Sequence, residues 1–156
     1  MNVALPADLA ERIPRLFGDR GTEWVTALPG LVGSLCRRWD LTVVGPAFSG
    51  GTHSYVAPVR RAGRNGPDLV LKVPVRDDEN YAEAAALRCY AGDGAVRLHE
   101  VDLDSGGLLL EAADARRSLL AEYEGGRLPM EEVVGIAAGL LGALSRPPSG
   151  DLSCPA

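Results

Sequence analysis

The sequence predicts an α+β fold, in which helices at both ends of the chain flank an antiparallel sheet. Residues 7–39 and 129–145 carry apolar side chains three or four residues apart, the spacing of a helix face. Residues 41–75 and 95–113 consist of short runs rich in β-branched and aromatic residues, bounded by Gly, Pro and Asn. Such runs are typical of strands joined by hairpins. The length of 156 residues suits one domain of ordinary size.

The N-terminal region, residues 1–40, is predicted to form two helices over 7–17 and 22–39. Apolar residues recur at helical spacing in both segments. Thr22 is a candidate N-cap for the second helix. Pro29 is expected to break or kink that helix, because proline removes a backbone donor and clashes with the preceding turn.

The central region, residues 41–113, changes to the pattern of strands with one helix between them. Gly, Pro and Asn punctuate the strand patterns, and acidic residues fill the first turn of the helix pattern. We expect strands in 41–51, 52–61 and 68–75, a helix over 76–92, and two strands around the turn Asp104–Gly107.

The C-terminal region is predicted to be a linker and one apolar helix, within residues 114–146. The helix, 129–145, has no charged residue between 133 and 144 and therefore presents a wide apolar face. Residues 147–156 are rich in Pro, Gly and Ser and are expected to be disordered. We infer that the helix lacks a partner surface that it would normally pack against, so it is a candidate for self-association.

Composition excludes several classes of function. The net charge of −5 and the pI of about 5.0 argue against a nucleic-acid partner. No apolar run approaches the roughly 18 residues needed to span a bilayer, and the N-terminus lacks the pattern of a signal peptide. The three cysteines form no CxxC and no metal-ligand spacing with His53 or His99. We therefore expect a cytoplasmic protein with no membrane partner.

A glycine-rich turn, "FSGGTHS" over 48–54, is the first candidate site. The paired Gly50 and Gly51 would let backbone amides approach an anion, since no Cβ intervenes. A plain hairpin turn explains the same residues. The segment 45–52 nearly matches the phosphate-binding spacing G-x-x-x-x-G-K-[ST], but Gly51 stands where that motif requires lysine.

The second candidate is Lys72, the only lysine among 16 Lys and Arg residues. It lies inside the apolar strand pattern "DLVLKVPV", where a charge needs a partner. Glu79 and Glu83 on the following helix are candidates, and Glu83 is favoured because its helix surface is more apolar. Two alternatives remain open: an edge strand from which Lys72 reaches solvent, and an ordinary solvated Glu83.

The order of these features is that of the small lobe of a protein-kinase-like phosphotransferase: a glycine-rich hairpin, a lysine, a glutamate on a helix, then two strands. The sequence resembles the aminoglycoside/hydroxyurea phosphotransferases, especially the streptomycin 6-phosphotransferase type, over about residues 5–146. The stretches that carry the resemblance are "LPADLAERIPRLFGDRGTEWVTALPGLVGSLCRRWDL", "FSGGTHSYV", "LVLKVPV", "ENYAEAAALRCYAGDGAVRLHEVD" and "GLLLEAA".

The resemblance implies ATP-dependent transfer of a phosphoryl group to a hydroxyl of an aminoglycoside-like acceptor, an antibiotic-resistance activity, with residues 41–113 as the nucleotide-binding lobe. Lysine suits phosphate because it is a compact point charge. By position, the resemblance implies that Lys72 would bind the phosphates, Glu83 would orient Lys72, and the phosphates would be covered by Ser49, Gly50, Gly51 and Thr52. Val56 and Val70 would sandwich the adenine. After the gatekeeper-like Leu110, the backbone of Glu111 and Ala113 would hydrogen-bond the adenine edge.

The sequence departs from the family in one respect. Family members carry a second, larger lobe with an HGD-type catalytic loop and the ligands for Mg²⁺, and no such motif occurs here. The segment "HEVDLD" (99–104) is interpreted as strand and turn. We therefore expect a truncated chain without catalytic residues, inactive alone, in which helix 129–145 is the first helix of the missing lobe.

Three alternatives stay open at this point. The chain could be a non-catalytic nucleotide-binding or protein-interaction module that docks through helix 129–145. It could derive from a kinase for hydroxyurea or a host metabolite, since the sequence does not indicate the acceptor. It could also be an inert fragment.

Overall fold

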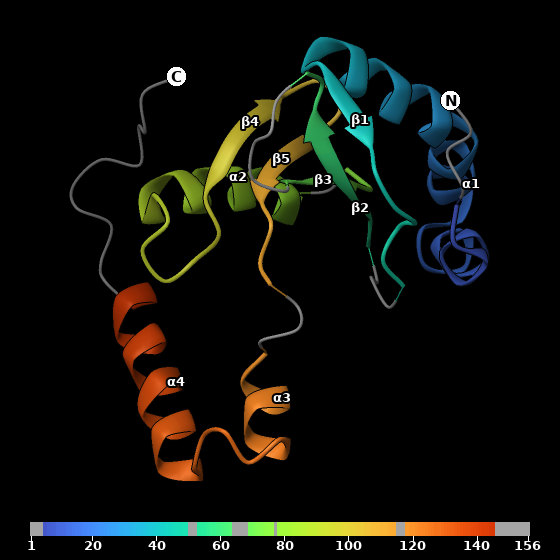
Figure 1. Ribbon diagram of the computed structural model, residues 1–156. Helices are drawn as coiled ribbons and strands as arrows, with labels where there is room; N and C mark the ends of the chain where they lie inside the picture. The colour runs from blue at the N-terminus through green and yellow to red at the C-terminus, as the bar shows by residue number, and fades with distance from the viewer. Residues whose placement is uncertain (1–4, 50–52, 64–68, 77, 115–117, 146–156) are drawn as a thin grey trace. The chain divides into compact units, whose positions relative to one another are not determined.

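The computed structural model describes residues 5–49, 53–63, 69–76, 78–114 and 118–145 (Figure 1). Contacts divide the chain into two compact units. The sheet unit comprises Met1–Ala84 with Leu98–Ala112, and the helical unit comprises Ala85–Arg97 with Ala113–Ala156. The boundary between the units falls within the helix of residues 78–90.

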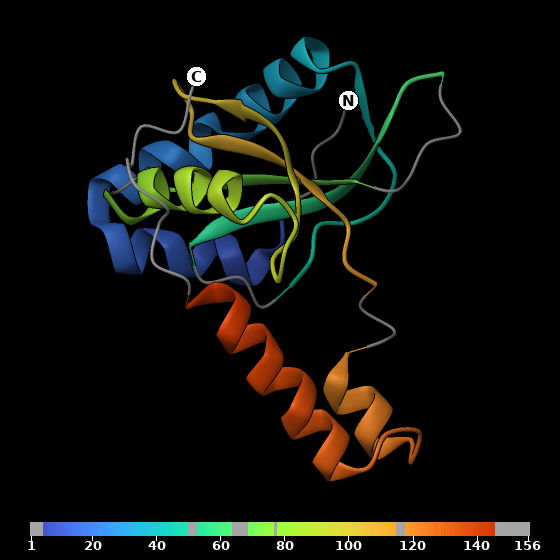
Figure 2. The same cartoon turned by 90° about the vertical axis from the view of Figure 1, so that its left-hand side faces the viewer.

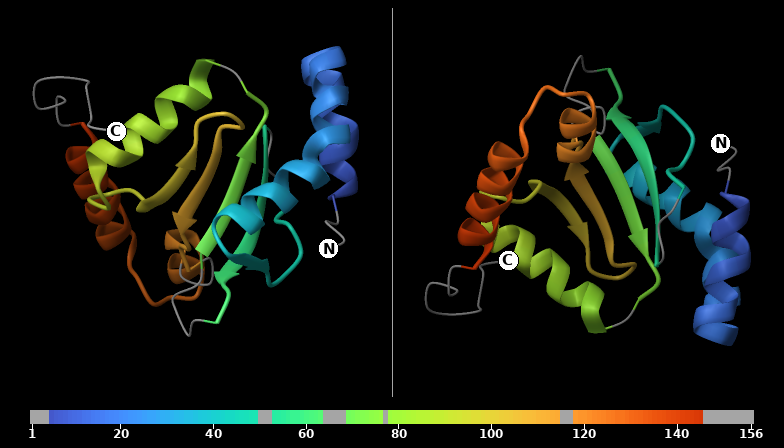
Figure 3. Two further views of the ribbon diagram at one scale, coloured as in Figure 1. Left: turned by 90° about the horizontal axis from the view of Figure 1, so that it is seen from above. Right: turned by 90° about the horizontal axis from the view of Figure 1, so that it is seen from below.

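Helix α1, Ala7–Arg38, is bent, as both views of Figure 3 show, and its non-helical backbone angles are at Gly18. Gly18 adopts φ 60° and ψ −135°, a conformation that glycine reaches without steric cost. Beyond the bend, a Cβ on Gly21 would stand 2.5 Å from the Ile13 carbonyl oxygen, so a glycine is needed for this close approach. The two predicted N-terminal helices are therefore present. The predicted N-cap at Thr22 is wrong, because the chain is already helical there and the Thr22 hydroxyl donates to the Gly18 carbonyl at 3.2 Å. The predicted break at Pro29 is wrong, because Gly18 is the residue of α1 with non-helical backbone angles.

The sheet has five antiparallel strands, as predicted, with β3 at its centre. The first strand is shorter than the predicted 41–51, because it ends at Val43 and residues 44–49 are not in a strand. The order β1-β2-β3-β5-β4 arises because β5 inserts between β3 and β4. A register shift interrupts β4 beside β5. The segment "HEVDLD" forms strand and turn, which confirms its interpretation. The strands are β1 Leu41–Val43, β2 Ser54–Arg61, β3 Leu69–Pro74, β4 Leu98–Asp102 and β5 Gly107–Glu111.

The hydrophobic core lies between α1 and one face of the sheet. Alternate residues of a strand point to opposite faces, and the residues of β2 and β3 that face α1 are buried. The sheet lies between α1 and the first turns of the next helix, α2, in both views of Figure 3. The core residues of α1 include Leu9, Ile13, Trp24, Leu28, Val32 and Leu35, and those of the strands include Tyr55, Ala57, Val59, Leu69, Leu71, Val73 and Leu109.

Helix α2, Asp78–Tyr90, and helix α4, Met130–Leu144, match their predicted positions. Helix α3, Leu119–Glu124, was not predicted. The Ser118 hydroxyl caps it by accepting a hydrogen bond from the Ala121 amide, and a serine before "LLA" was the available signal.

Within the helical unit, α3 and α4 lie side by side in Figures 1 and 2. The Tyr90 hydroxyl donates to the Leu144 carbonyl at 3.2 Å, which joins the end of α2 to the end of α4. Neither α3 nor α4 has a buried residue. The large apolar side chains that α4 exposes are Met130, Val134, Ile136, Leu140 and Leu141. In the described part of the chain, no helix combines the length and apolar character required to cross a membrane.

Candidate functional site

Lys72 lies on the central strand, on the sheet face opposite the core. Its neighbours Leu71 and Val73 are fully buried toward α1, whereas the Lys72 side chain retains 24% exposure on the other face. Strand β3 pairs with β2 on one side and β5 on the other. The edge-strand alternative for Lys72 is therefore wrong.

The Lys72 ammonium donates to both carboxylate oxygens of Glu83, at 2.6 and 2.7 Å. Glu83 is on α2, and its side chain is 29% exposed, so both charges are partly withdrawn from water. The predicted pairing of these two residues is thus present, and the solvated-glutamate alternative for Glu83 is wrong. The ion pair links the central strand to α2 and holds the Lys72 ammonium on the sheet face opposite the core.

An apolar surface adjoins the ammonium on the same sheet face. Val56 and Leu108 are the cross-strand partners of Lys72, one on each side. Val70, two residues before Lys72, has Leu110 as its partner on β5. Cross-strand partners share a face, so these four side chains surround Lys72. Leu108 and Leu110 are buried, and Val56 and Val70 are partly exposed beside the ammonium. Such a surface suits a ligand with a flat apolar end and an anionic end.

The glycine-rich turn is described only in part. Ser49 is exposed at the end of one described segment, and Gly50, Gly51 and Thr52 lie outside the described residues. The turn joins the segment that ends at Ser49 to the start of β2, and Val56 on β2 lies opposite Lys72. The phosphate-covering role of the turn stays a prediction.

The remaining predicted residues fall at the end of β5 and beyond it. Leu110 is buried, and Glu111 is exposed as the last residue of β5, paired in register with Leu69. Ala113 belongs to the helical unit. The predicted contacts of Glu111 and Ala113 with an adenine edge therefore stay predictions.

Sequence reasoning missed two contacts that α1 makes with the strand ends near Lys72. The Trp24 indole N–H donates to the Pro74 carbonyl at 2.9 Å, and both residues are buried. The Phe17 ring meets the His53 ring edge-on, with centroids 5.4 Å apart. A buried indole usually has an acceptor, so Trp24 on an apolar helix face was a signal for some contact, although not for this one.

On the core side of the sheet, two groups have raised pKa values, and neither is a candidate catalytic residue. Burial raises the pKa of the Cys36 thiol, and Arg37 opposes that rise by a smaller amount. Burial also raises the pKa of Tyr55, with a further increase from the nearby Cys36. Both groups are held protonated within the core, so neither is placed to act as a nucleophile.

The described residues hold no cluster of metal-ligating side chains. Among them, no group of three or more His, Cys, Asp or Glu side chains lies close enough together to hold an ion. Mg²⁺ prefers oxygen ligands in octahedral arrangement. Among the described residues, the outer face of the sheet thus carries one ammonium group paired with Glu83 and no group of three or more metal-ligating side chains.

Comparison with known proteins gives consistent matches over nearly the whole chain. The family model described as "Aminoglycoside/hydroxyurea antibiotic resistance kinase" matches residues 38–154. A hydroxyurea phosphotransferase from Kitasatospora aureofaciens is 43% identical over 150 residues, 95% of this chain and 42% of that protein. A streptomycin 6-kinase from Streptomyces glaucescens is 38% identical over 94% of this chain and 45% of its own length.

A second streptomycin 6-kinase, from Streptomyces griseus, is 36% identical over 95% of this chain and 46% of its own length. The chain thus spans less than half the length of the curated relatives that it matches. These relatives are phosphotransferases by name, which is the class of protein that the order of strand, lysine and helix glutamate also indicated.

Proposed function

The chain belongs to the aminoglycoside/hydroxyurea antibiotic resistance kinase family, and we propose that its sheet unit binds the ATP of a phosphotransferase reaction. The acceptor in that reaction is a hydroxyl group of a small molecule. The observation that carries the proposal is the ion pair between Lys72 and Glu83 on the central strand, with apolar side chains beside it.

Lys72 supplies the charge for the phosphates in this proposal. Its ammonium has three N–H donors, and Glu83 orients it through two oxygens. Because Glu83 already neutralises Lys72, the ammonium avoids the cost of an unpaired charge before nucleotide binds. Val56 and Val70 contact the adenine, and Ser49 with residues 50–52 covers the phosphates.

Phosphoryl transfer needs more than a lysine that binds phosphate. It depends on a metal ion and a group that orients the attacking hydroxyl. The described residues offer no metal site, and the sequence holds no HGD-type loop. We therefore expect the 156-residue chain to bind ATP and to transfer no phosphate to either streptomycin or hydroxyurea, the acceptors that its relatives' names indicate.

The test is a calorimetric titration of the chain with ATP, in parallel with the Lys72→Ala variant. Loss of a hydrogen bond to a charged group is worth about 1.5–3 kcal/mol, so we expect affinity to fall about 10- to 100-fold. Lys72→Arg should also bind weakly, because the longer forked guanidinium does not reproduce the pairing geometry. Equal ATP binding by Lys72→Ala would refute the proposal.

Glu83→Gln has a matched control in Glu11→Gln. Glu11 also pairs with a basic residue, Arg15, but at 3.5 Å on an exposed part of α1. We expect Glu83→Gln to weaken ATP binding and Glu11→Gln to leave it unchanged. The same weakening from both variants would show that net charge, rather than orientation of Lys72, sets the affinity.

A second candidate function is self-association through α4, with a second copy of this chain as the occupant. The observation that favours it is the row of large apolar side chains on α4, which are 41–65% exposed. Residues 133–144 carry no charge, so two copies would meet without repulsion. Sedimentation equilibrium of the wild type and Leu140→Glu tests it: a dimer that the variant abolishes supports it, and a monomeric wild type excludes it.

A further inference from the structure

We propose that helix α1 positions the phosphate-binding corner, with Trp24 as the main positioning residue. This inference rests on the proposed nucleotide-binding function. It concerns the corner formed by the start of β2, the end of β3 and the ion pair between Lys72 and Glu83, all within the sheet unit.

Three contacts, or tethers, connect α1 to this corner, and the first is a direct hydrogen bond. Pro74 ends β3, two residues after Lys72, and its carbonyl accepts the hydrogen bond from the Trp24 indole. Pro74 is fully buried, so its carbonyl would be costly to leave without a donor. The bond therefore fixes the position of the end of β3 relative to α1. It also fixes where the connection from β3 to α2 begins.

The second tether holds the neighbouring strand end. The Val75 amide donates to the His53 carbonyl at 2.9 Å, which joins the end of β3 to the residue that precedes β2. The Phe17 ring packs edge-on against the His53 ring, and the Arg20 guanidinium lies 5.6 Å from the centre of the Phe17 ring. Residue 53 lies within the glycine-rich segment 48–54, two positions after Gly51. The same helix thus contacts the end of β3, through Trp24, and the residue before β2, through Phe17.

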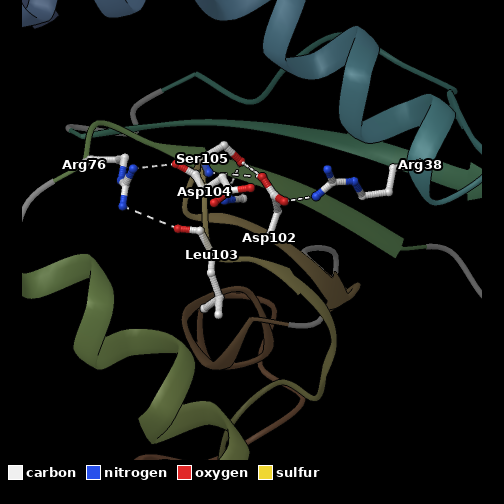
Figure 4. A network of polar contacts seen from close by, with 7 residues as sticks. Arg38, Arg76, Asp102, Leu103, Asp104 and Ser105 are labelled. Carbon is white, nitrogen blue, oxygen red and sulfur yellow. Dashed lines mark hydrogen bonds and ion pairs between the residues drawn. The ribbon is translucent and has the colours of Figure 1, made fainter. Parts of the chain in front are cut away.

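A third tether reaches the connection between β3 and α2 from the end of α1 (Figure 4). Arg38 in the last turn of α1 pairs with Asp102, which is buried at the end of β4. Asp102 also accepts bonds from the Ser105 amide and hydroxyl, which fixes the turn between β4 and β5. The carbonyls of Leu103 and Asp104 in this turn accept bonds from Arg76.

The three tethers converge on residues 74–76, the segment between Lys72 on β3 and Glu83 on α2. Both partners of the ion pair are attached to the two ends of this segment. Loss of a tether should therefore loosen the pairing of Lys72 with Glu83 without removing either residue. The effect on nucleotide is specific: it should weaken binding of ATP but not of adenosine, which has no phosphate for Lys72.

The test uses Trp24→Phe with Trp39→Phe as its matched control. The chain has two tryptophans, both are 8% exposed, and both belong to the core beside α1. The two variants remove the same atoms, but only Trp24 donates to Pro74. Because Lys72 is the only lysine, isotope labelling of lysine gives one side-chain Nζ signal, which reports the ion pair directly.

We expect Trp24→Phe to move the Lys72 signal toward its position in Glu83→Gln and to weaken ATP binding about two- to tenfold, as for the loss of one hydrogen bond. Trp39→Phe should change neither, even where it lowers the melting temperature. Arg76→Met, at an exposed position, should act like Trp24→Phe with a smaller effect and covers the case in which Trp24→Phe does not fold.

An unchanged Lys72 signal in both Trp24→Phe and Arg76→Met would overturn the inference, as would equal shifts from Trp24→Phe and Trp39→Phe. Failure of the proposed function looks different. In that case the wild-type chain shows no Lys72-dependent binding of ATP, while the Lys72 signal still responds to the tethers.

Discussion

The two units of the chain differ in how far their apolar residues are buried. In the sheet unit, α1 and one sheet face enclose a core that includes Ile13, Leu28 and Leu71, each with no measurable exposure. Every buried hydrophobic residue of the described chain belongs to this unit. In the helical unit, α4 is more apolar along its length yet buries nothing.

This difference indicates which part of the molecule keeps the candidate site rigid. Lys72 and Glu83 are fixed on one sheet face because the opposite face is filled by side chains from α1. The helical unit has no comparable support, so its apolar surface contributes little to folding of the chain by itself.

The largest contrast should come from Leu28→Ala against Leu141→Ala. Leu28 is fully buried against the sheet, and its truncation should lower the free energy of unfolding by about 2–5 kcal/mol. Leu141 on α4 is 65% exposed, and its truncation should change stability by less than about 0.5 kcal/mol. Urea unfolding followed by circular dichroism measures both, and similar losses would mean that the units do not differ in burial.

The second contrast is between two glycines of α1. Gly21→Ala places a Cβ 2.5 Å from the Ile13 carbonyl oxygen, so it should destabilise by about 1–3 kcal/mol. Gly30 is helical and exposed, with open space around an added Cβ. Gly30→Ala should therefore stabilise by about 0.5–1 kcal/mol. Opposite signs are expected in the same unfolding assay, and a neutral Gly21→Ala would contradict the close approach at the bend.

The third contrast lies within the helical unit. Gly139→Ala adds a methyl to α4 where it meets no described atom within 4 Å, so helix content should rise with a gain of up to about 1 kcal/mol. Gly94 has φ +79°, and a Cβ there would lie 3.2 Å from the Ala143 Cβ. Gly94→Ala should lower helix content at 222 nm. An increase in both variants would show that α4 does not contact the segment after α2.

The smallest effect is a pH dependence that belongs to the core. Burial raises the pKa of Cys36 above its ordinary value of 9.0, so the folded state holds the thiol proton more tightly than the unfolded state. Stability is therefore full below pH 9.0 and decreases as the pH rises above it. Tyr55 adds a decrease of the same sign above pH 10.0.

Thermal unfolding between pH 8 and 10 compares Cys36→Ala with Cys89→Ala. Cys36→Ala should flatten the decline in melting temperature with pH. Cys89 is exposed on α2, and its replacement should leave the decline as it is in the wild type. A flatter decline in Cys89→Ala would assign the pH dependence to the wrong thiol.

Most of the fold could be predicted from local pattern. The five strands and helices α2 and α4 follow from the spacing of apolar residues and from the turn residues between them. The bend of α1 was misplaced because Pro29 is a stronger sequence signal than Gly18, yet the helix accommodates the proline and bends where positive φ is available. Helix α3 is six residues long, which is too short for a periodic signal.

Of the candidate site, the sequence allowed only the charged pair of Lys72 and Glu83 to be predicted, and not the contacts that support it. A lone lysine in an apolar strand requires a partner, and the next helix supplied Glu83. The contact between Trp24 and Pro74 joins residues 50 positions apart, and that between Arg38 and Asp102 joins residues 64 apart. Such pairs depend on how α1 crosses the sheet, which local periodicity does not determine.

The central claim is that Lys72 binds nucleotide phosphate, and a titration of the lysine-labelled chain tests it most directly. Addition of ATP should shift the single Lys72 signal in a saturable manner, while adenosine at the same concentrations leaves the signal in place. A Lys72 signal that does not respond to ATP, or that responds equally to adenosine, would contradict the assignment of Lys72 to the phosphates.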